Sequence, residues 1–503
     1  MKLADLEHAR VAVWGYGREG RAALAVLRKR FPHKALTLIC SEDEARKTRE
    51  PGRESPSPPT LSGERTGVRG QRGESSETIG QIVAPPPHPT LSPIEGDGGE
   101  GLLEIVTAPP DADVLTQFDI VIKSPGISPY KSPIPEAVVA GVEFTSGTAL
   151  WFAENPGARA KYGIIGVTGT KGKSTTSAMI AHIARALGIR TALAGNIGLP
   201  ILELDGQQAD LWVVELSSFQ TGEAGPLEVG VITNLYEEHL DWHGSREQYR
   251  ADKLKLADAA RTLVVNAEQP DLLARTAAHP RRVMFGDAVG WHVRDGGIRR
   301  GKESILPLAK IPLPGEHNAQ NVCAALAAIE CAGLDAIVAA NHVADFRPLP
   351  HRLQSLGVRD GIEYINDSIS TTPYATIEAL RSLQGRAVTV LVGGFDRGVD
   401  WNPFVEYVAY HAPHGIVAMG AHGARIAESL RGIRDCDVTR VATLDEAVSR
   451  ARAQAPAGSV VLLSPGAPSF DQFADYAERG REFARLAGFD PAAIASIEGL
   501  GIA

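Results

Sequence analysis

The segment that most constrains the fold is 164–174, Ile-Ile-Gly-Val-Thr-Gly-Thr-Lys-Gly-Lys-Ser, which joins a buried apolar run to a helical pattern over 172–187. A glycine-rich turn between a strand and a helix lets backbone N–H groups approach phosphates, and the helix N-terminus adds positive charge. In such a turn Lys173 would reach the β- and γ-phosphates of a nucleotide, and the Ser174 hydroxyl would ligate Mg²⁺. Because Val167 replaces the usual first glycine, a plain strand-to-helix turn is the alternative.

Elsewhere, short apolar runs alternate with helical patterns, which is typical of parallel α/β sheets. A chain of 503 residues also predicts about three domains, at roughly 100–200 residues per domain. The sequence predicts strands at 10–14, 36–40 and 119–123, then at 162–167, 211–215, 229–234 and 261–265, and finally at 361–366, 387–392, 415–418 and 459–463. We therefore predict three α/β domains, residues 1–146, 147–348 and 349–503.

Residues 47–101 differ in composition from the rest of the chain. This window of 55 residues holds 9 Pro and 10 Gly, and it contains no Phe, Tyr or Trp. It also repeats itself, since Pro-Thr-Leu-Ser occurs at 59–62 and again at 89–92. Such a segment buries too little apolar surface to offset the entropy of ordering it, so we predict a disordered low-complexity insertion. The alternative is a docking segment built around the prolines at 85–87.

Charge and composition exclude several classes of protein. The 51 basic and 60 acidic side chains give a net charge of −9, which argues against a nucleic-acid-binding protein. No apolar run approaches the length of a membrane span, and acids at positions 5 and 7 interrupt any signal peptide. The four cysteines show no CxxC spacing, so neither a disulfide framework nor a zinc site is expected. We predict a cytoplasmic protein without membrane contacts, and a monomer because no large exposed apolar face is indicated.

Polar side chains stand at the ends of two further predicted strands. Glu215 ends strand 211–215, and His239 follows strand 229–234. Because ligands bind at the carboxyl ends of strands in open α/β sheets, Glu215 is placed to hold Mg²⁺ beside the phosphates. His239 is a further candidate metal ligand or proton carrier. From its neighbours alone, Lys253 is an ordinary surface lysine.

A second glycine-rich turn, Gly-Tyr-Gly-Arg-Glu-Gly at 15–20, follows the first predicted strand. Its GxGxxG spacing is typical of dinucleotide binding, and Glu42 stands near where an acid would bind a ribose, so an NAD-dependent oxidoreductase is one hypothesis. The turn itself binds a diphosphate, whatever is attached to it. The polar turn 124–126 follows another strand near the same sheet edge. At the start of a predicted helix, His317 or Asn318 is either an N-cap or a nucleotide contact.

Together these motifs resemble the Mur ligase family, ATP-dependent amide-forming enzymes of peptidoglycan precursor synthesis. The resemblance covers nearly the whole chain outside 47–101. It is carried by Gly-Thr-Lys-Gly-Lys-Ser (169–174), Gly-Asn-Ile-Gly-Leu-Pro (195–200), Glu-Leu-Ser-Ser-Phe-Gln (215–220), Glu-His-Leu-Asp (238–241), His-Asn-Ala-Gln-Asn (317–321), Leu-Pro-His-Arg (349–352), Asn-Asp-Ser (366–368) and Leu-Ser-Pro (463–465). It implies a Rossmann-like N-terminal domain that binds UDP, a central P-loop ATPase domain with a parallel sheet, and a Rossmann-like C-terminal domain that binds glutamate.

The resemblance also implies site residues in four groups. The UDP-substrate contacts are Gly15, Gly17, Arg18, Glu19, Gly20, Ser124, Pro125, Gly126, Asn196, Ser217 and Gln220. The ATP contacts are Gly169, Thr170, Lys171, Gly172, Lys173, Ser174, Thr175, Asn318, Asn321, Arg352 and Asp367. The glutamate contacts are Thr371, Arg397, Ser469, Phe470 and Tyr476. The catalytic residues are Lys173, Glu215, His239 and Lys253, and two Mg²⁺ sites use Ser174, Glu215, His239 and a carbamylated Lys253.

The implied substrates are UDP-N-acetylmuramoyl-L-alanine, glutamate and ATP. ATP phosphorylates the terminal carboxylate of the first substrate, and the glutamate amine then attacks the acyl phosphate. Lys173 and Mg²⁺ offset the negative charge that gathers on the transferred phosphoryl group. Carbamylation turns the cation of Lys253 into a carboxylate, which can ligate Mg²⁺.

In the third domain the sequence departs from the family pattern. Enzymes that add D-glutamate usually carry lysines where Ile369 and Arg397 stand here, and Tyr476 occupies a position where an aromatic without a hydroxyl is common. An inverted centre redirects one carboxylate of glutamate, and an unpaired buried carboxylate is costly, so its cation must move as well. These departures favour the branch that adds L-glutamate, with D-glutamate as the alternative.

Other hypotheses stand beside the glutamate-adding ligase. The glycine-rich turn at 169–174, here called the phosphate loop, argues against a nicotinamide oxidoreductase. Intact Lys173, Glu215, His239 and Lys253 argue against a non-catalytic sugar-nucleotide-binding protein. Within the ligase class, enzymes that polyglutamate folate or add alanine are near alternatives, and the run 464–472 favours glutamate addition.

Overall fold

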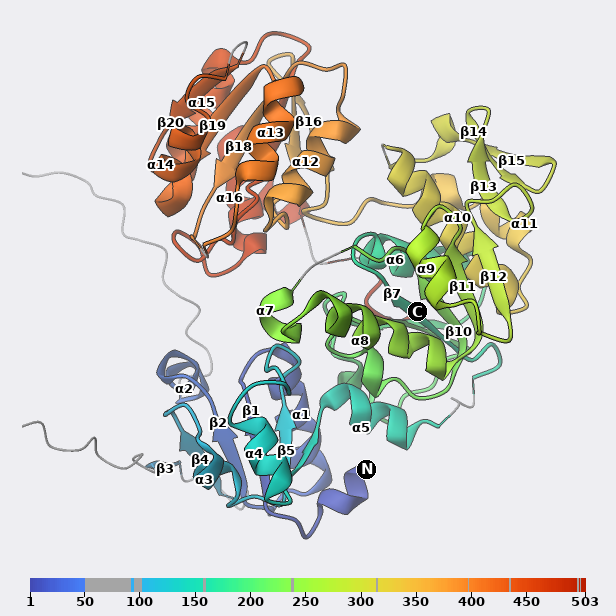
Figure 1. The fold of residues 1–503 in the computed structure, drawn as a ribbon, viewed down its shortest axis with the longest axis vertical. Helices are drawn as coiled ribbons and strands as arrows, with labels where there is room; N and C mark the ends of the chain where they lie inside the picture. Colours follow the sequence, from blue (N-terminus) through green and yellow to red (C-terminus); the bar gives the residue numbers. More distant parts are fainter. Residues whose placement is uncertain are drawn as a thin grey trace, which may run out of the picture. The chain divides into compact units, whose positions relative to one another are not determined.

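The computed structural model describes residues 1–49, 92–94, 102–156, 160–236, 239–313, 315–396, 398–433, 436–494, 497 and 499–503. Three β-sheets flanked by helices confirm the predicted α/β class (Figure 1). Met1–Glu154, Pro200–Asp205 and Asp241–Gly244 form one compact unit, and the rest of the chain forms a second. Among the described helices, none is both long and apolar enough to cross a membrane. The predicted domain boundaries stay a prediction.

The first sheet has the strand order β3-β4-β2-β1-β5-β6. Its strands are β1 (Val11–Trp14), β2 (Leu36–Ile39), β3 (Ser92–Ile94), β4 (Leu103–Val106), β5 (Ile120–Lys123) and β6 (Glu143–Thr145). All pairs are parallel except β3 with β4. The helices of this unit are η1 (Leu3–Leu6), α1 (Arg18–Arg30), α2 (Glu42–Arg49), α3 (Ala112–Leu115), α4 (Ile134–Val139), α5 (Gly147–Glu154) and η2 (Ile201–Leu204). Strand β3 and the end of α2 fall within 47–101. The other residues of that window lie outside the described residues, so its disorder stays a prediction.

The second sheet has the order β15-β14-β13-β12-β11-β10-β7-β9-β8-β22. Its strands are β7 (Ile164–Thr168), β8 (Thr191–Gly195), β9 (Leu211–Glu215), β10 (Leu227–Ile232), β11 (Ala260–Asn266), β12 (Arg282–Phe285), β13 (Trp291–Arg294), β14 (Gly297–Arg300), β15 (Glu303–Pro307) and β22 (Gly501–Ile502). The helices of this part of the second unit are α6 (Lys173–Ala186), η3 (Thr221–Glu223), α8 (Arg246–Ala259), α9 (Pro270–Arg275), η4 (Leu308–Lys310), α10 (Glu316–Cys331), α11 (Ala336–Ala340) and η5 (Val343–Asp345). Most of α7 (Leu240–His243) falls within Asp241–Gly244 of the first unit. Buried residues of α6 and α10 form one core with β7, β9 and β10.

The third sheet has the order β16-β17-β21-β18-β19-β20. Its strands are β16 (Gln354–Arg359), β17 (Ile362–Asn366), β18 (Val388–Gly393), β19 (Gly415–Met419), β20 (Asp437–Arg440) and β21 (Val460–Leu463). Its helices are α12 (Pro373–Ser382), α13 (Asn402–Tyr410), α14 (Gly420–Ser429), α15 (Leu444–Gln454), α16 (Tyr476–Ala487) and η6 (Pro491–Ala493). Only β16 runs antiparallel to its neighbour.

Alternation along β18 shows how helices cover both faces of the third sheet. Val390 and Val392 pack with apolar residues of α12, α13 and α14. Leu391 points to the opposite face and packs with apolar residues of α15 and α16. Successive side chains of a strand point to opposite faces, so a strand covered on both sides is a continuous apolar run. Both faces of the third sheet are therefore covered by helices.

Strand β22 adds the end of the described chain to the second sheet beside β8. The backbones of Thr191 and Ala503 bond to each other in both directions, at 2.7 and 3.2 Å. The Arg185 guanidinium, near the end of α6, donates to the carbonyls of Thr191 and Gly501 at 2.8 and 3.0 Å. The edge of β8 is thus paired, and β8 leads directly into the predicted site segment 195–200.

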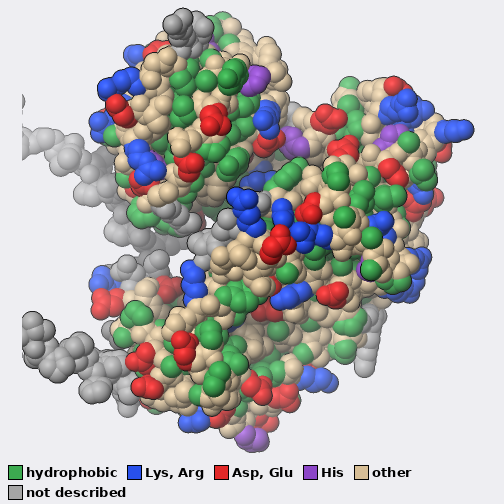
Figure 2. Space-filling view, viewed as in Figure 1, with side chains coloured by type: hydrophobic (Ala, Val, Ile, Leu, Met, Phe, Trp, Pro, Cys, Tyr) green, Lys and Arg blue, Asp and Glu red, His purple; other side chains and the backbone are tan. Residues whose placement is uncertain are grey.

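Charged side chains of both signs are interspersed on the viewed face (Figure 2). On α8 and α9 they form ion pairs, such as Arg250 with Glu247 at 2.8 Å and Arg275 with Asp271 at 2.9 Å. These pairs are solvent-exposed, so each stabilises the fold by less than about 1 kcal/mol.

Candidate active site

The phosphate loop lies between β7 and α6, as predicted from the sequence. Gly169 (φ +145°) and Gly172 (φ +81°) adopt left-handed backbone conformations, which residues with a Cβ rarely adopt. A Cβ at Gly169 would collide with the Thr233 side chain, and a Cβ at Gly172 would collide with Asn321. The loop therefore requires glycine at both positions.

The segment after β10 braces this loop. Asn234 Oδ1 accepts the N–H groups of Thr170 and Lys171 at 3.1 and 2.8 Å. Thr233 Oγ1 donates to the Lys171 carbonyl at 2.6 Å. The sequence analysis missed these two bracing residues. The available signal was a Thr-Asn pair directly after a buried apolar strand.

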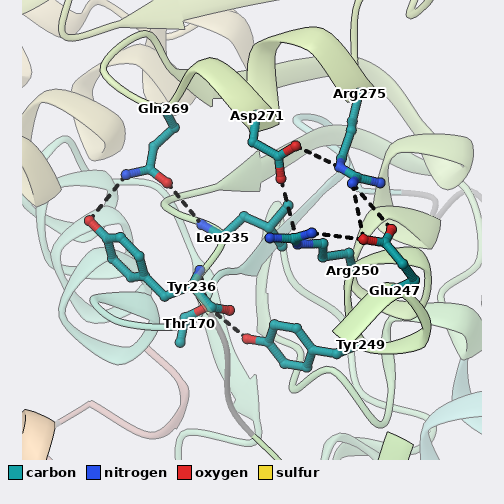
Figure 3. A network of polar contacts seen from close by, with 9 residues as sticks. All are labelled: Thr170, Leu235, Tyr236, Glu247, Tyr249, Arg250, Gln269, Asp271 and Arg275. Carbon is teal, nitrogen blue, oxygen red and sulfur yellow. Dashed lines mark hydrogen bonds and ion pairs between the residues drawn. The ribbon is translucent and has the colours of Figure 1, made fainter. Parts of the chain in front are cut away.

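Helix α8 and residues 235–236 hold the same loop from another side (Figure 3). Thr170 Oγ1 accepts the Tyr236 N–H at 2.9 Å and donates to the Tyr236 carbonyl at 3.0 Å. The hydroxyl of buried Tyr249 lies 2.7 Å from Thr170 Oγ1, so with Thr170 already donating, Tyr249 is the donor. The Tyr236 hydroxyl accepts from Gln269 at 3.1 Å, and Gln269 Oε1 accepts the Leu235 N–H at 3.4 Å. Segment 234–236 and helix α8 thus fix the position of Thr170, and Gln269 in turn holds Leu235 and Tyr236.

Lys173 and Ser174 stand at the start of α6. Lys173 Nζ donates to the Thr170 carbonyl at 3.0 Å, which places the ammonium over the loop. Arg352 Nη2 donates to the buried Ser174 hydroxyl at 2.9 Å. Two of the predicted ATP contacts, which are far apart in sequence, therefore meet at the helix N-terminus.

Glu215 ends β9 and has no exposed surface. Asn196 Nδ2 donates to its Oε1 at 2.7 Å. Its Oε2 is buried and makes no hydrogen bond to the described residues. Leaving a buried carboxylate oxygen without a partner is costly. The side chain is therefore suited to holding a cation beside the phosphate loop.

Lys253 is buried, with only 2% of its surface exposed, so the expectation of an ordinary surface lysine is wrong. Its Nζ donates to the Gly169 carbonyl at 2.9 Å and lies 5.0 Å from the centre of the Tyr249 ring. The two residues are one helical turn apart on α8, which packs on β7 and β10. Helix packing, which the neighbouring residues do not reveal, brings Lys253 to the phosphate loop.

His239 is exposed and has a left-handed backbone (φ +56°). Its ring centre lies 5.1 Å from that of Phe219. Glu237 and Glu238 lie outside the described residues. Within the described ranges, no group of three or more His, Cys, Asp or Glu side chains is placed to hold a metal ion. The assignment of His239 as a metal ligand stays a prediction.

The candidate nucleotide contacts on α10 are inside the helix rather than at its cap. The helix begins at Glu316, and Gly315 (φ +93°) is its N-cap, so His317 and Asn318 as caps were wrong. The left-handed glycine starts the helix earlier than the sequence pattern indicates. Asn321 Nδ2 donates to Asn318 Oδ1 at 3.2 Å, close to Gly172.

Three further predicted contacts are buried and hydrogen-bonded. Ser217 Oγ donates to Gln220 Oε1 at 2.8 Å. Asp367 Oδ2 accepts from the hydroxyls of Ser370 and Ser464 at 2.5 and 2.8 Å. Burial nevertheless raises the pKa of Asp367 to about 6.

The glycine turn of the first unit is shaped for close backbone packing. Gly15 (φ +96°) accepts a hydrogen bond from Ser124 Oγ at 3.4 Å, and a Cβ at Gly20 would collide with the Gly15 carbonyl. Gly17 is the N-cap of α1, so Arg18 and Glu19 lie in its first turn. Glu44 accepts the Tyr16 N–H of this turn at 3.2 Å, and Glu42 as a ribose-binding acid stays a prediction. The sequence analysis also missed Trp242, whose Nε1 donates to the Pro125 carbonyl at 3.0 Å.

The predicted glutamate contacts vary in burial. Ser469 is buried, whereas Phe470 and Thr371 are exposed. Tyr476 is the first residue of α16, and its carbonyl accepts from Ser368 Oγ at 2.8 Å. Arg397 lies outside the described residues. The structure therefore brings Ser368 and Tyr476 together, and all five glutamate contacts stay predictions.

Comparison with known proteins identifies the family. The Mur ligase middle domain matches residues 167–329, and the Mur ligase glutamate ligase domain matches residues 351–466. The chain is 44% identical over 515 residues to a UDP-N-acetylmuramoyl-L-alanine--L-glutamate ligase of Xanthomonas euvesicatoria, covering all of both chains. The chain belongs to the Mur ligase family. A protein of the same name from Salinispora tropica is 36% identical, over 96% of this chain and 98% of the relative.

Solved structures of other Mur ligases share the fold. The UDP-N-acetylmuramate-alanine ligase of Thermotoga maritima covers 95% of this chain with 19% identity and a TM-score of 0.57. MurF ligase from the same organism, in complex with ADP, covers 98% with 13% identity and a TM-score of 0.52. At these identities the likeness concerns the fold alone. Mur ligases are ATP-dependent and use Mg²⁺, and the unpaired Oε2 of Glu215 fits that requirement.

In this Mur ligase, replacing Tyr249 with Phe is expected to destabilise the fold by about 1 kcal/mol, the net contribution of one buried hydrogen bond. The KM for ATP should rise severalfold, because Thr170 loses its bond to α8. Urea denaturation and steady-state kinetics measure the two effects.

The matched control is Tyr236→Phe, which also removes one phenolic hydroxyl. That hydroxyl is on a half-exposed side chain and bonds to Gln269, away from Thr170. Its loss should change stability by less than about 0.5 kcal/mol. Equal effects of the two substitutions would contradict the role assigned to Tyr249.

Proposed function

We propose that this Mur ligase joins L-glutamate to UDP-N-acetylmuramoyl-L-alanine, with ATP as the energy source, in peptidoglycan precursor synthesis. The observation that carries the proposal is full-length identity of 44% to ligases named for this reaction, together with a match of residues 351–466 to a glutamate ligase domain. Residues 1–146 would bind the UDP substrate, 147–348 ATP and 349–503 glutamate.

The reaction proceeds through an acyl phosphate. The terminal carboxylate of UDP-N-acetylmuramoyl-L-alanine attacks the γ-phosphorus of ATP, and ADP leaves. The glutamate amine then attacks the acyl carbon, loses a proton, and phosphate leaves as the amide forms. The first step gathers negative charge on the transferred phosphoryl group, so groups that offset this charge lower the barrier.

Residues of this chain take distinct roles in these steps. Lys173, over the phosphate loop, would contact the transferred phosphoryl oxygens. Ser174, Glu215, His239 and carbamylated Lys253 would hold two Mg²⁺ ions, which neutralise phosphate charge when bound. Asn196, which donates to Glu215, would orient that carboxylate and contact the UDP substrate. Asn321, Arg352 and Asp367 would contact ATP.

The preference for L-glutamate rests on the third sheet. Ile369 follows Ser368 directly after β17 and is half-buried, where the D-glutamate-adding members usually carry a lysine. Moving one cation moves the carboxylate that it pairs with, since a buried carboxylate needs a partner. The relatives that share the whole chain are named for L-glutamate.

The stereochemical test supplies L- or D-glutamate with ATP and UDP-N-acetylmuramoyl-L-alanine. We expect kcat/KM for L-glutamate to exceed that for D-glutamate at least about a hundredfold, the scale of one misplaced charged contact. Chiral chromatography of the hydrolysed product identifies the isomer. A preference for D-glutamate would overturn the stereochemical assignment and leave the ligase assignment in place.

A further inference from the structure

Arg479 is a buried arginine that none of the predicted site groups contains. It lies on α16, one turn after Tyr476, and only 1% of its surface is exposed. Its Nε donates to Ser368 Oγ at 3.1 Å, and its Nη2 donates to the Ser368 carbonyl at 2.8 Å. Both acceptors are neutral, and both belong to the loop that follows β17.

The remaining nitrogen of the guanidinium faces a second loop. Nη1 is buried and makes no hydrogen bond to the described residues. A Cβ built at Gly394 would lie 3.1 Å from Nη1, so the nitrogen points at the turn that follows β18. The Phe395 N–H of that turn donates to the Pro468 carbonyl at 2.9 Å, one residue before buried Ser469. Arg479 therefore lies under the strand-end loops of β17, β18 and β21.

The protein itself gives this cation little compensation. Among the described residues, no carboxylate forms an ion pair with Arg479, and Asp471 is the acid whose charge favours the protonated form. Asp471 also accepts the Ala421 N–H at 3.1 Å. Asp367, on the β17 loop, is engaged by Ser370 and Ser464. Burial lowers the pKa of Arg479 to about 10, so it stays charged at neutral pH.

Other titratable groups on the surrounding elements have hydrogen-bond partners of their own. Asp475 accepts the Glu478 N–H at the start of α16, and Glu478 accepts the Ala474 N–H. His351 is buried and bonds to Asn366, and burial together with Arg481 lowers its pKa to about 4, so it is neutral. Burying a cation without a paired anion is unfavourable, and a well-placed bound anion offsets part of that cost. The loops around Arg479 are those proposed to hold glutamate, a substrate with two carboxylates.

We propose that Arg479 is a specificity-determining residue, whose buried charge favours the side-chain carboxylate of glutamate bound over the loops at Ser368, Gly394 and Ser469. This inference rests on the proposed function and names the cation that selects an acidic amino acid. The charge acts from beneath the loops, at short range and away from water, where electrostatic interactions are strong. The half-buried Ile369 beside Ser368 leaves the β17 loop without a cation at that position.

The experiment compares glutamate with glutamine, a neutral isostere of its side-chain carboxylate, by measuring kcat/KM for each. In Arg479→Met we expect kcat/KM for glutamate to fall at least about 30-fold, the scale of a lost buried charge pair. The value for glutamine should change less than about threefold, so the glutamate-to-glutamine ratio collapses. The KM for ATP should be unchanged.

Two variants separate charge from scaffolding. Arg479→Lys keeps the positive charge but loses the paired donors of the planar guanidinium. Ser368→Ala removes the acceptor of the Arg479 Nε hydrogen bond and keeps the charge. Both should retain the glutamate-to-glutamine ratio within about threefold, even where overall activity drops. If Arg479→Met does not fold, a collapsed ratio in Arg479→Lys overturns the proposal, and a retained ratio supports it.

The outcomes distinguish the two proposals. Equal losses for glutamate and glutamine in folded Arg479→Met would make the arginine merely structural and overturn the inference. A wild-type enzyme that forms no amide with glutamate of either hand would overturn the proposed function itself.

Discussion

Lys173→Met is expected to lower kcat for amide formation by at least about 10²–10³, the cost of removing one group that stabilises transition-state charge. The ammonium of Lys173 lies at the N-terminus of α6, 3.0 Å from the Thr170 carbonyl, where the loop and the helix end converge. Methionine keeps most of the side-chain length and removes the positive charge, so the fold should persist. Coupled detection of ADP measures the rate.

Lys161→Met is the matched control for this substitution. Lys161 is exposed and precedes β7, the strand that leads into the phosphate loop. Its Nζ lies 5.0 Å from the centre of the Tyr162 ring, away from that loop. The Lys161→Met substitution should leave kcat within about twofold of the wild-type value, as expected for a surface substitution. If the rate of Lys173→Met stays within tenfold of the wild-type rate, Lys173 does not stabilise the transferred phosphoryl group as proposed.

Lys253→Ala is the second substitution with a large expected effect. We expect a loss of activity of about 10²–10³, with partial restoration by millimolar formate or acetate. The reason is that a carbamylated lysine acts as a carboxylate, and a small carboxylate can enter the cavity that alanine leaves. Lys255→Ala, two residues later on α8 and ion-paired with Asp252 at 2.7 Å, should remain active.

The contacts of Lys253 supply the opposing outcome. Its ammonium donates to the Gly169 carbonyl, so an unmodified lysine would brace the phosphate loop as a cation. If methylammonium restores the alanine variant and carboxylates do not, the cation is the working form and carbamylation is wrong for this enzyme. Mass spectrometry of the intact wild-type chain at raised bicarbonate gives an independent readout.

The α/β class and the phosphate loop could be predicted because their signals are local. Strands such as β7 and β21 are buried on both faces, so they are continuous apolar runs that the sequence displays directly. Gly169 and Gly172 have positive φ angles, which favour glycine, so the glycines of the phosphate loop are visible in the sequence. By contrast, β12 to β15 and β22 are short strands towards the sheet edges, where alternation over a few residues carries little signal.

Local sequence patterns could not predict features that depend on tertiary packing or on a single backbone conformation. Lys253 is buried because α8 packs on β7 and β10. No local sequence pattern shows this packing. Arg479 is one of several basic residues on α16, and only the packed helix shows that it points inward. Gly315 has a positive φ and is the N-cap of α10. His317 and Asn318 therefore lie inside the helix and not at the predicted cap position.

In the proposed reaction, glutamate and the UDP-linked substrate together trigger ATP cleavage. The most direct measurement incubates the wild-type enzyme with ATP, Mg²⁺, UDP-N-acetylmuramoyl-L-alanine and L-glutamate, and quantifies ADP and amide product by mass spectrometry. We expect one ADP for each amide formed, and almost no ADP when either substrate is omitted. ADP release without an amide product, or no reaction with glutamate of either configuration, would contradict it.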